Sequence, residues 1–280
     1  MSLSVQTSFA SMVTQNSLSS ANDRLTTAME RLSTGYAVNS AADNAAGLAI
    51  ATRMQSQSDG IAVAQSNVED ASSMLSTADG ALESMVDIVG RMKDLATQAA
   101  NDTYDTDDRT AMKTEYDELA SQLTSVMDNT DFGGTDLLSS SGLLGSGAVQ
   151  FQVGASSAET LSVDLSTSLG TITTDITTSA ADTLDTAANA TTAITNLETM
   201  LTDITSVRSQ VGASINRLDY ISDNLTNMQE NTDSAIGNIM DADYAAETSE
   251  MSKQQLLEQA GISVLSAVSD AQSLIQNLLQ

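Results

Sequence analysis

The chain has 280 residues, of which 37 are acidic and 10 are basic, giving a formal net charge of −27. This balance argues against nucleic-acid binding, which needs clustered Lys and Arg, and it disfavours anionic membrane surfaces. Cysteine and histidine are absent, which excludes disulfides, thiol catalysis and thiolate metal sites and removes the commonest general base. With no proline and 3% aromatic residues, the composition favours long helices in thin bundles over a thick core.

No motif for catalysis or cofactor binding stands out, since the sequence has no nucleophile–base pair, HExxH, P-loop or GxGxxG. The acidic run from Asp102 to Asp108 fails as a calcium loop, because counting from Asp105 places Arg109 at the fifth position and Tyr116 at the twelfth. We interpret this run as a helix cap. The sequence therefore predicts a protein that is not an enzyme, with no catalytic residues, no metal and no cofactor.

The N-terminus lacks the features of a cleavable signal peptide, because its first cation is Arg24 and residues 1–22 contain no continuous apolar run. No segment approaches the roughly 20 apolar residues of a membrane span. We therefore expect no membrane insertion. We also expect a location in the cytoplasm, or outside the cell by a route independent of such a peptide.

Charge is distributed unevenly along the chain. Residues 1–42 sum to zero and residues 259–280 carry only Asp270, so residues 43–258 hold −26 of the −27. The ends are thus nearly uncharged, while the middle has an acidic, solvated surface. We expect copies of the chain to repel each other through this middle part, and salt to screen that repulsion.

Helical periodicity dominates the first half of the chain. Apolar residues recur at spacings of three and four without a break from Ile61 to Ala99. After residues 101–108, whose acids favour a helix N-terminus, a further helix is predicted to about Asn129. An earlier seam near the N-terminus consists of Leu18, Ala21, Leu25, Ala28 and Leu32.

The second half begins with a different composition. From Phe132 to about Thr178 the chain is rich in Gly, Ser and Thr, and alternating runs at 149–153 and 160–165 predict a β-hairpin. Helical spacing returns near Asp182, and the helices 44–100 and 183–238 would each be about 80 Å long. Their similar lengths predict antiparallel neighbours. The last helix has a clean heptad seam: Leu257, Ala260, Val264, Ala267, Ala271, Leu274 and Leu278.

These elements predict a mainly α fold. Long antiparallel, coiled-coil-like helices form a rod with a small β-hairpin region, and the terminal helices pair into an inner coiled coil. A lone pair of helices with such modest apolar stripes buries little surface, so we expect the terminal helices to order against copies of themselves. The pattern and the charge by themselves predict a polymer.

Signatures at both ends of the chain resemble those of bacterial flagellins. The first combines residues 31–36 (RLSTGY), 39–41 (NSA) and 43–54 (DNAAGLAIATRM). The second combines residues 241–247 (DADYAAE), 251–253 (MSK) and 259–261 (QAG), and the family's turn and hairpin are matched by 132–138 (FGGTDLL) and 151–155 (FQVGA). The likeness covers about residues 1–165 and 185–280. The chain departs from the family at Ala42–Asn44, lacks a proline near the C-terminus, and nearly lacks the central outer domains.

The resemblance implies an inner domain of residues 1–42 and 243–280 that forms a filament core. It implies an outer rod domain of residues 43–182 and 183–242, with three long helices and the hairpin, and a vestigial variable region at 166–184. The implied function is a structural subunit, exported unfolded and polymerised through its terminal helices into the flagellar filament used for swimming. The implied polymerisation interface is Leu18, Leu25, Leu32, Ala46, Gly47, Leu257, Val264, Leu274 and Leu278.

The implied partners are identical subunits, an export chaperone, the secretion apparatus, and the filament cap and junction proteins, with the filament outside the cell. The patch that Toll-like receptor 5 recognises in flagellins matches Arg91, Leu95 and Glu115. Assembly would bury this patch, so only the monomer would bind the receptor. The alternative is that Arg91 and Glu115 are solvated surface charges.

The stretch Asn39–Met54 (NSAADNAAGLAIATRM) consists mostly of small residues. The resemblance implies that it turns between the inner and outer helices, where small side chains and Gly47 allow close packing between subunits. The alternative is an ordinary helix N-terminus that follows an Asp cap.

Two other functions remain open at this point. One is a hook–filament junction protein of the same axial family, which copy number would distinguish from a filament subunit. The other is a monomeric secreted binding module, which would not polymerise.

Overall fold

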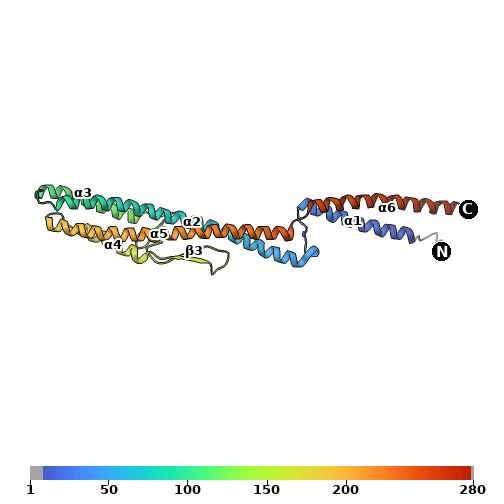
Figure 1. The fold of residues 1–280 in the computed structure, drawn as a ribbon, viewed down its shortest axis with the longest axis horizontal. Helices are drawn as coiled ribbons and strands as arrows, with labels where there is room; N and C mark the ends of the chain where they lie inside the picture. The colour runs from blue at the N-terminus through green and yellow to red at the C-terminus, as the bar shows by residue number, and fades with distance from the viewer. Residues whose placement is uncertain (1–8, 279–280) are drawn as a thin grey trace. The chain divides into compact units, whose positions relative to one another are not determined.

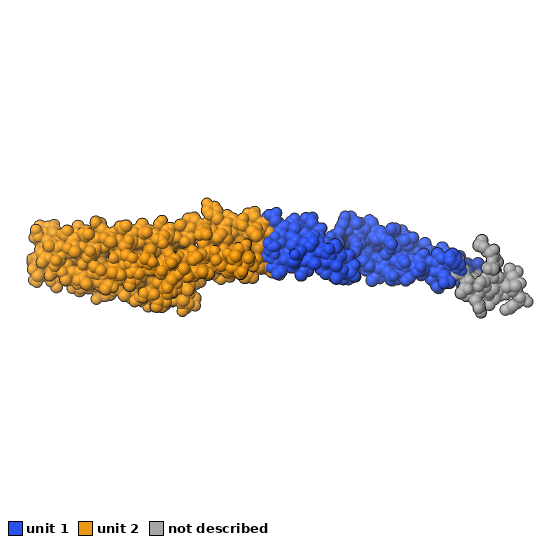
Figure 2. Space-filling model, turned by 90° about the horizontal axis from the view of Figure 1, so that it is seen from below, with its two compact units in different colours: residues 1–58, 230–280 blue, residues 59–229 orange. Residues whose placement is uncertain are grey.

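The computed structural model describes residues 9–278, with the backbone alone for residues 10, 272 and 274–278. The chain forms two compact units: unit 1 comprises residues 1–58 and 230–280, and unit 2 comprises residues 59–229 (Figure 2). The predicted inner segments 1–42 and 243–280 fall inside unit 1, which extends further along the chain at both boundaries.

The secondary structure is mainly α, as predicted, with two small antiparallel strand pairs (Figure 1). The helices are α1 (Phe9–Thr34), α2 (Ala41–Ala99), α3 (Thr106–Asn129), α4 (Ser166–Ala181), α5 (Ala187–Met240) and α6 (Tyr244–Leu278). The strands are β1 (Asp131–Phe132), β2 (Thr135–Asp136), β3 (Val149–Gln152) and β4 (Thr160–Val163). Helices α2 and α5 each continue from one unit into the other.

Unit 2 is built on antiparallel segments of α2 and α5. Gln65 donates a hydrogen bond to Thr226, and Lys93 pairs with Glu198, so residue numbers rise on one helix as they fall on the other. The antiparallel prediction is therefore confirmed. The predicted heptad residues of α2 are buried in one continuous core, which also contains Leu197, Met200, Ile204, Val207, Val211, Leu218 and Leu225 of α5.

Helix α3 begins as its acidic N-terminal sequence predicts. Asp105 accepts hydrogen bonds at 2.9 Å from the backbone N–H groups of Asp107 and Asp108, and Asp108 completes a capping box with the Asp105 backbone N–H. These bonds satisfy N–H groups that have no partner within the helix. The carboxylates also lie at the positive end of the helix dipole. The interpretation of this run as a helix cap is confirmed.

The two strand pairs follow from local turn chemistry. Strands β1 and β2 are joined by Gly133 and Gly134, both at positive φ, as a two-residue hairpin turn requires. Strands β3 and β4 form the predicted hairpin, with Val149 opposite Val163 and Phe151 opposite Leu161.

Helix α4 was not predicted from the sequence, which placed the return of helix near Asp182. Its residues Leu169, Ile172 and Ile176 recur at helical spacing and are buried in the core of unit 2. Threonines dominate the rest of the helix, and several of them, such as Thr173, donate to the carbonyl four residues earlier. The segment proposed as a variable remnant thus contributes to the core.

Unit 1 contains the two terminal helices together with the first part of α2 and the last part of α5. Helices α1 and α6 lie side by side (Figure 1). The Ser58 hydroxyl of α2 donates to the Asp233 carboxylate of α5 at 2.6 Å. Within residues 9–278, the chain has no helix that is both long and apolar enough to cross a bilayer.

Candidate assembly interface

The contact between α1 and α6 depends on small side chains. Ala21 and Ala28 of α1 are buried, and Leu18 of α1 lies 3.3 Å from where a Cβ would project from Gly261 of α6. Small residues at this contact let the two helices approach closely. The predicted seam of α1 therefore faces α6: Leu25 is buried, and Leu18 and Leu32 are half-buried.

The face of α6 that packs most closely against α1 is not its predicted seam. The least exposed residues of α6 are Glu247, Glu250, Met251, Gln254, Glu258, Gly261, Leu265 and Val268. In contrast, Leu257 is 49% exposed and Val264 is 50% exposed, and Ala260, Ala267 and Ala271 of the same seam are also exposed. The Leu274 and Leu278 side chains lie outside those that the structure describes.

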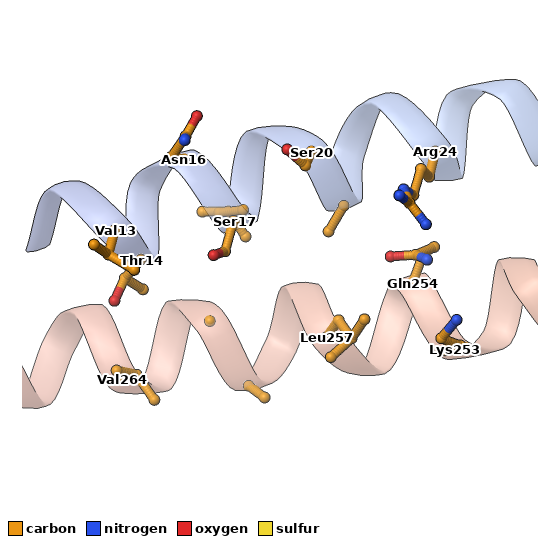
Figure 3. Close-up of a pocket in the computed structure, with 14 residues that line it drawn as sticks. Val13, Thr14, Asn16, Ser17, Ser20, Arg24, Lys253, Gln254, Leu257 and Val264 are labelled. Carbon is orange, nitrogen blue, oxygen red and sulfur yellow. The ribbon is translucent and has the colours of Figure 1, made fainter. Parts of the chain in front are cut away.

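The predicted seam instead lines an open groove of about 540 Å³ between α1 and α6 (Figure 3). Val13, Leu18 and Ala21 lie on the α1 side, and Leu257 and Val264 on the α6 side. The lining of the groove is mixed, because Thr14, Asn16, Ser17 and Ser20 of α1 lie among these apolar side chains (Figure 3). Its other lining residues include Arg24, Lys253 and the buried Gln254, whose amide donates to Glu250.

Further large apolar side chains of unit 1 are exposed outside the groove. Phe9 at the start of α1 is 82% exposed, and Met12 follows it on the same helix, while Leu256 and Ile262 are exposed on α6. Large apolar side chains that gather on an exposed surface are typical of an interaction site. The terminal pair therefore carries more exposed apolar side chains than its own two helices cover.

A compact joint connects α1 to α2 and α5 to α6. The Ala37 N–H donates to the Met240 carbonyl at 2.6 Å, and the Ala242 N–H donates to the Gly35 carbonyl at 2.9 Å. Gly35 has φ +81°, a conformation that a side chain would strain. The α1–α2 connection and the α5–α6 connection are therefore held together by two backbone hydrogen bonds.

Arg31 stabilises this joint through ion pairs, a role that was not predicted from the sequence. Its guanidinium pairs with Glu247 at 2.9 Å and reaches Asp43 at 4.0 Å. Hydrogen bonds from the backbone and side chain of Ser40 lower the pKa of Asp43, and Arg31 adds to the effect. One cation thus links residues of α1, α2 and α6. The available signal was that Arg31 and Glu247 lie in the two terminal signatures.

The stretch Asn39–Met54 has an intramolecular explanation at one position. Asn44 is non-helical, and its side-chain oxygen accepts a hydrogen bond at 2.9 Å from the Gly47 N–H, so the long helix is capped by Asn44 and not by Asp43. A Cβ on Gly47 would lie 2.5 Å from the Asn44 amide nitrogen. Gly47 is buried, whereas Ala46 is exposed and available to another copy.

The three predicted receptor residues lie together in unit 2. The Arg91 guanidinium of α2 pairs with the Glu115 carboxylate of α3 at 2.6 Å, and both side chains are about half exposed. Leu95 is only 3% exposed and packs in the core. The surface that could meet a receptor is therefore the ion pair, with Leu95 supporting α2 beneath it.

A second electrostatic feature of unit 2 lies between α4 and α5. One carboxyl oxygen of Asp175 is buried without a hydrogen-bond partner, and Asp203 lies beside it. Burial, and then the neighbouring Asp203, raise the pKa of Asp175 to about 6. Among the described residues, no group of three or more acidic side chains is placed to hold a metal ion.

Both ends of the chain match known family regions. Residues 5–142 match the bacterial flagellin N-terminal helical region, and residues 194–280 match the bacterial flagellin C-terminal helical region. The chain belongs to the bacterial flagellin family. Flagellins are structural proteins of the flagellar filament, and this chain is such a filament subunit.

Full-length relatives agree with this assignment. The flagellin of Listeria innocua is 33% identical over 285 residues, covering 99% of each chain. The flagellin of Halalkalibacterium halodurans is 35% identical over 254 residues, covering 90% of this flagellin and 91% of the relative.

Among solved structures, Bacillus cereus flagellin is similar with a TM-score of 0.50 and 32% identity, covering 57% of this chain and 88% of that one. A putative flagellar hook-associated protein from Vibrio parahaemolyticus has a TM-score of 0.57 at 17% identity, covering 71% of this chain and 100% of that one. The second likeness concerns the fold alone. The hook–filament junction alternative is therefore not favoured.

Proposed function

We propose that this flagellin polymerises through unit 1, with the α1–α6 pair forming the inner layer of the filament. The observation that carries the proposal is the exposed seam of α6, in which the apolar side chains of Leu257 and Val264 line a groove that no described residue of the chain fills. Covering each half-exposed side chain would stabilise the polymer by about 1 kcal/mol. Many copies of such a contact sustain a filament without covalent bonds.

The interface is expected to be heterologous, because a helical polymer joins two different patches of the same chain. The groove supplies one patch, and the exposed side chains of α1, such as Phe9 and Met12, are suited to the other. Of the predicted interface residues, Leu18, Leu25 and Leu32 would act by holding α1 against α6. Leu257, Val264 and Ala46 would contact neighbours, Gly47 would shape the turn, and Leu274 and Leu278 would extend the seam.

Export and location belong to the same proposal. We expect the chain to leave the cell unfolded through the flagellar secretion apparatus, without a cleavable signal peptide, and to join the filament outside. An export chaperone would cover the exposed seam of α6 before secretion, and cap and junction proteins would flank the polymer. We propose no enzymatic activity. The family resemblance supports these partners, and the uncovered apolar surface of α6 gives a chaperone a reason to bind.

Recognition by Toll-like receptor 5 is a further part of the proposal. The exposed Arg91–Glu115 ion pair offers a receptor both a donor and an acceptor. The monomer would bind and the filament would not. Arg91→Ala should weaken binding to the receptor ectodomain, whereas Leu95→Ala should act mainly by destabilising unit 2.

Electron microscopy of full-length protein in moderate salt tests the assembly proposal. Versions that lack residues 1–20 or 260–280, and Leu257→Ser with Val264→Ser in the full chain, should form no long uniform tubes. Gln255→Ser, at an exposed α6 position off the seam, is the matched control and should assemble normally. Tubes of ordinary length from the truncated chains would refute the proposal.

A further inference from the structure

One cation of unit 2 is left without an acidic partner. Residues 59–229 contain 26 Asp and Glu but only six Lys and Arg. Five of the six cations form ion pairs: Arg91, Lys93, Arg109, Lys113 and Arg208. Within residues 9–278, no carboxylate lies within ion-pair distance of the sixth, Arg217. A guanidinium without a partner is unexpected where carboxylates outnumber cations more than fourfold.

Arg217 stands beside an exposed aromatic ring. It lies on α5 one helical turn before Tyr220, which is 77% exposed, and Val211, Leu218 and Leu225 on the opposite side of the helix are buried. The outer face thus presents a flat ring and a planar cation together. Tyr and Arg are among the residues most enriched at the energetic centres of protein interfaces.

A complementary stripe lies on α2 of the same unit. Val63 is 62% exposed, although the rest of the apolar surface of α2 in this unit is largely buried. Asp70 lies seven residues further on, on the same face, is exposed, and forms no ion pair within the described residues. This stripe therefore offers an apolar side chain that can pack against the Tyr220 ring and a carboxylate that can pair with the Arg217 guanidinium.

We propose that the α5 stripe of one copy docks on the α2 stripe of a second copy, with Tyr220 against Val63 and Arg217 paired with Asp70. The inference rests on the proposed polymerisation and adds a contact in unit 2 to the one in unit 1. The two stripes are different surfaces of one chain, so the contact is heterologous and propagates without closing.

The proposed docking requires the Arg217 side chain to reach along the helix, because the two residue pairs are spaced differently. Val63 and Asp70 are about 10.5 Å apart along α2, and Arg217 and Tyr220 about 4.5 Å apart along α5, at 1.5 Å per residue. An extended Arg side chain covers the remaining distance of roughly 6 Å. The pairing requires α5 of one copy to run antiparallel to α2 of the next. Copies that lie side by side in the same orientation meet this condition, because α2 and α5 are antiparallel within unit 2.

A charge-swap cycle in the full chain tests the contact. Critical concentrations for polymerisation are measured by sedimentation for the wild type, Arg217→Glu, Asp70→Arg and the double swap. Each single reversal should raise the critical concentration by about tenfold or more, because it sets like charges opposite each other. The double swap should return to within about threefold of the wild type. Glu69→Arg, at the exposed neighbouring position, is the matched control and should behave like the wild type.

The outcomes separate this contact from the assembly proposal. If the wild type polymerises and both single reversals polymerise equally well, the unit 2 contact is refuted while assembly through unit 1 stands. Single reversals that weaken assembly without rescue by the swap refute the pairing of Arg217 with Asp70. Failure of the wild type itself to polymerise refutes the proposed function. Circular dichroism melting of the monomers confirms that the variants remain folded.

Discussion

Replacement of Asp175 by Asn should remove a loss of folding stability that unit 2 suffers as the pH rises. Burial and the neighbouring Asp203 raise the pKa of Asp175 from 3.8 to about 6 in the folded chain. The unfolded chain has no such environment, so it releases the proton at lower pH. Because the folded-state pKa is the raised one, the contribution of Asp175 to stability is complete below pH 4. It is lost as the pH rises toward 6.

The size of the effect follows from the shift. Two pKa units correspond to roughly 3 kcal/mol if the whole shift were expressed as stability. Asp175 is partly exposed, so solvent screens its charge, and we expect about 1 kcal/mol. The free energy of unfolding of the wild type should therefore fall by about this amount between pH 4 and pH 7, relative to Asp175→Asn.

Urea titration followed by circular dichroism measures the difference. Wild type and Asp175→Asn are compared at pH 4 and pH 7, as monomers at low protein concentration. Carboxylates that do not contact Asp175, including Asp182, contribute equally to both proteins and cancel in the comparison, so the measured difference belongs to Asp175 together with its neighbour Asp203. Asp128→Asn, at an exposed position of α3, controls for loss of a surface charge. If the stability difference between wild type and Asp175→Asn were the same at both pH values, the reasoning from burial and charge would be refuted.

Three further predictions concern packing, a buried hydroxyl and charge. Gly47→Ala should destabilise the start of α2 by about 1 kcal/mol, because the added Cβ displaces the Asn44 cap. Gly80→Ala has open space around it and should stabilise the protein by about 0.5–1 kcal/mol. Thermal melting and hydrogen exchange near residue 47 distinguish the two variants. Tyr116→Phe should be neutral or slightly stabilising in urea titration, since the Tyr116 hydroxyl is buried without a hydrogen-bond partner. Salt should strengthen assembly, measured as a falling critical concentration. Residues 43–258 hold −26 of the net charge, so neighbouring copies repel each other, and the Debye length shortens to about 3 Å at 1 M salt. Filaments that were equally stable in very dilute buffer would count against the last prediction.

Periodicity predicted the elements whose burial is internal to one chain. The seam from Ile61 to Ala99 is buried as an unbroken stripe, and the acids before α3 cap it as expected. These features depend on spacing and on local hydrogen bonds, and both are contained in the sequence. The β-hairpin was found for the same reason, since alternation and turn residues are local signals.

Helix α4 was missed because its signal is mixed. Leu169, Ile172 and Ile176 have helical spacing, but the intervening threonines are β-branched and disfavour a helix when considered alone. Tertiary packing decides the outcome, because burial of three large side chains outweighs small propensity differences. The joint at Arg31 was missed for a different reason, because its partners Asp43 and Glu247 are brought together only by the fold.

The seam of α6 marks the limit of what one sequence can assign. Its heptad of Leu257, Val264 and small residues was the clearest in the chain, yet the closest contact with α1 uses a stripe that contains Gln254 and Glu258. Apolar periodicity shows that a face is to be buried, but it does not state whether the partner lies in the same chain or in another copy. In a subunit that polymerises, the strongest apolar stripe can therefore be the one that a single chain leaves open. Under the proposed assembly, a second molecule would cover the α6 seam, as helices of the same chain cover the seam of α2.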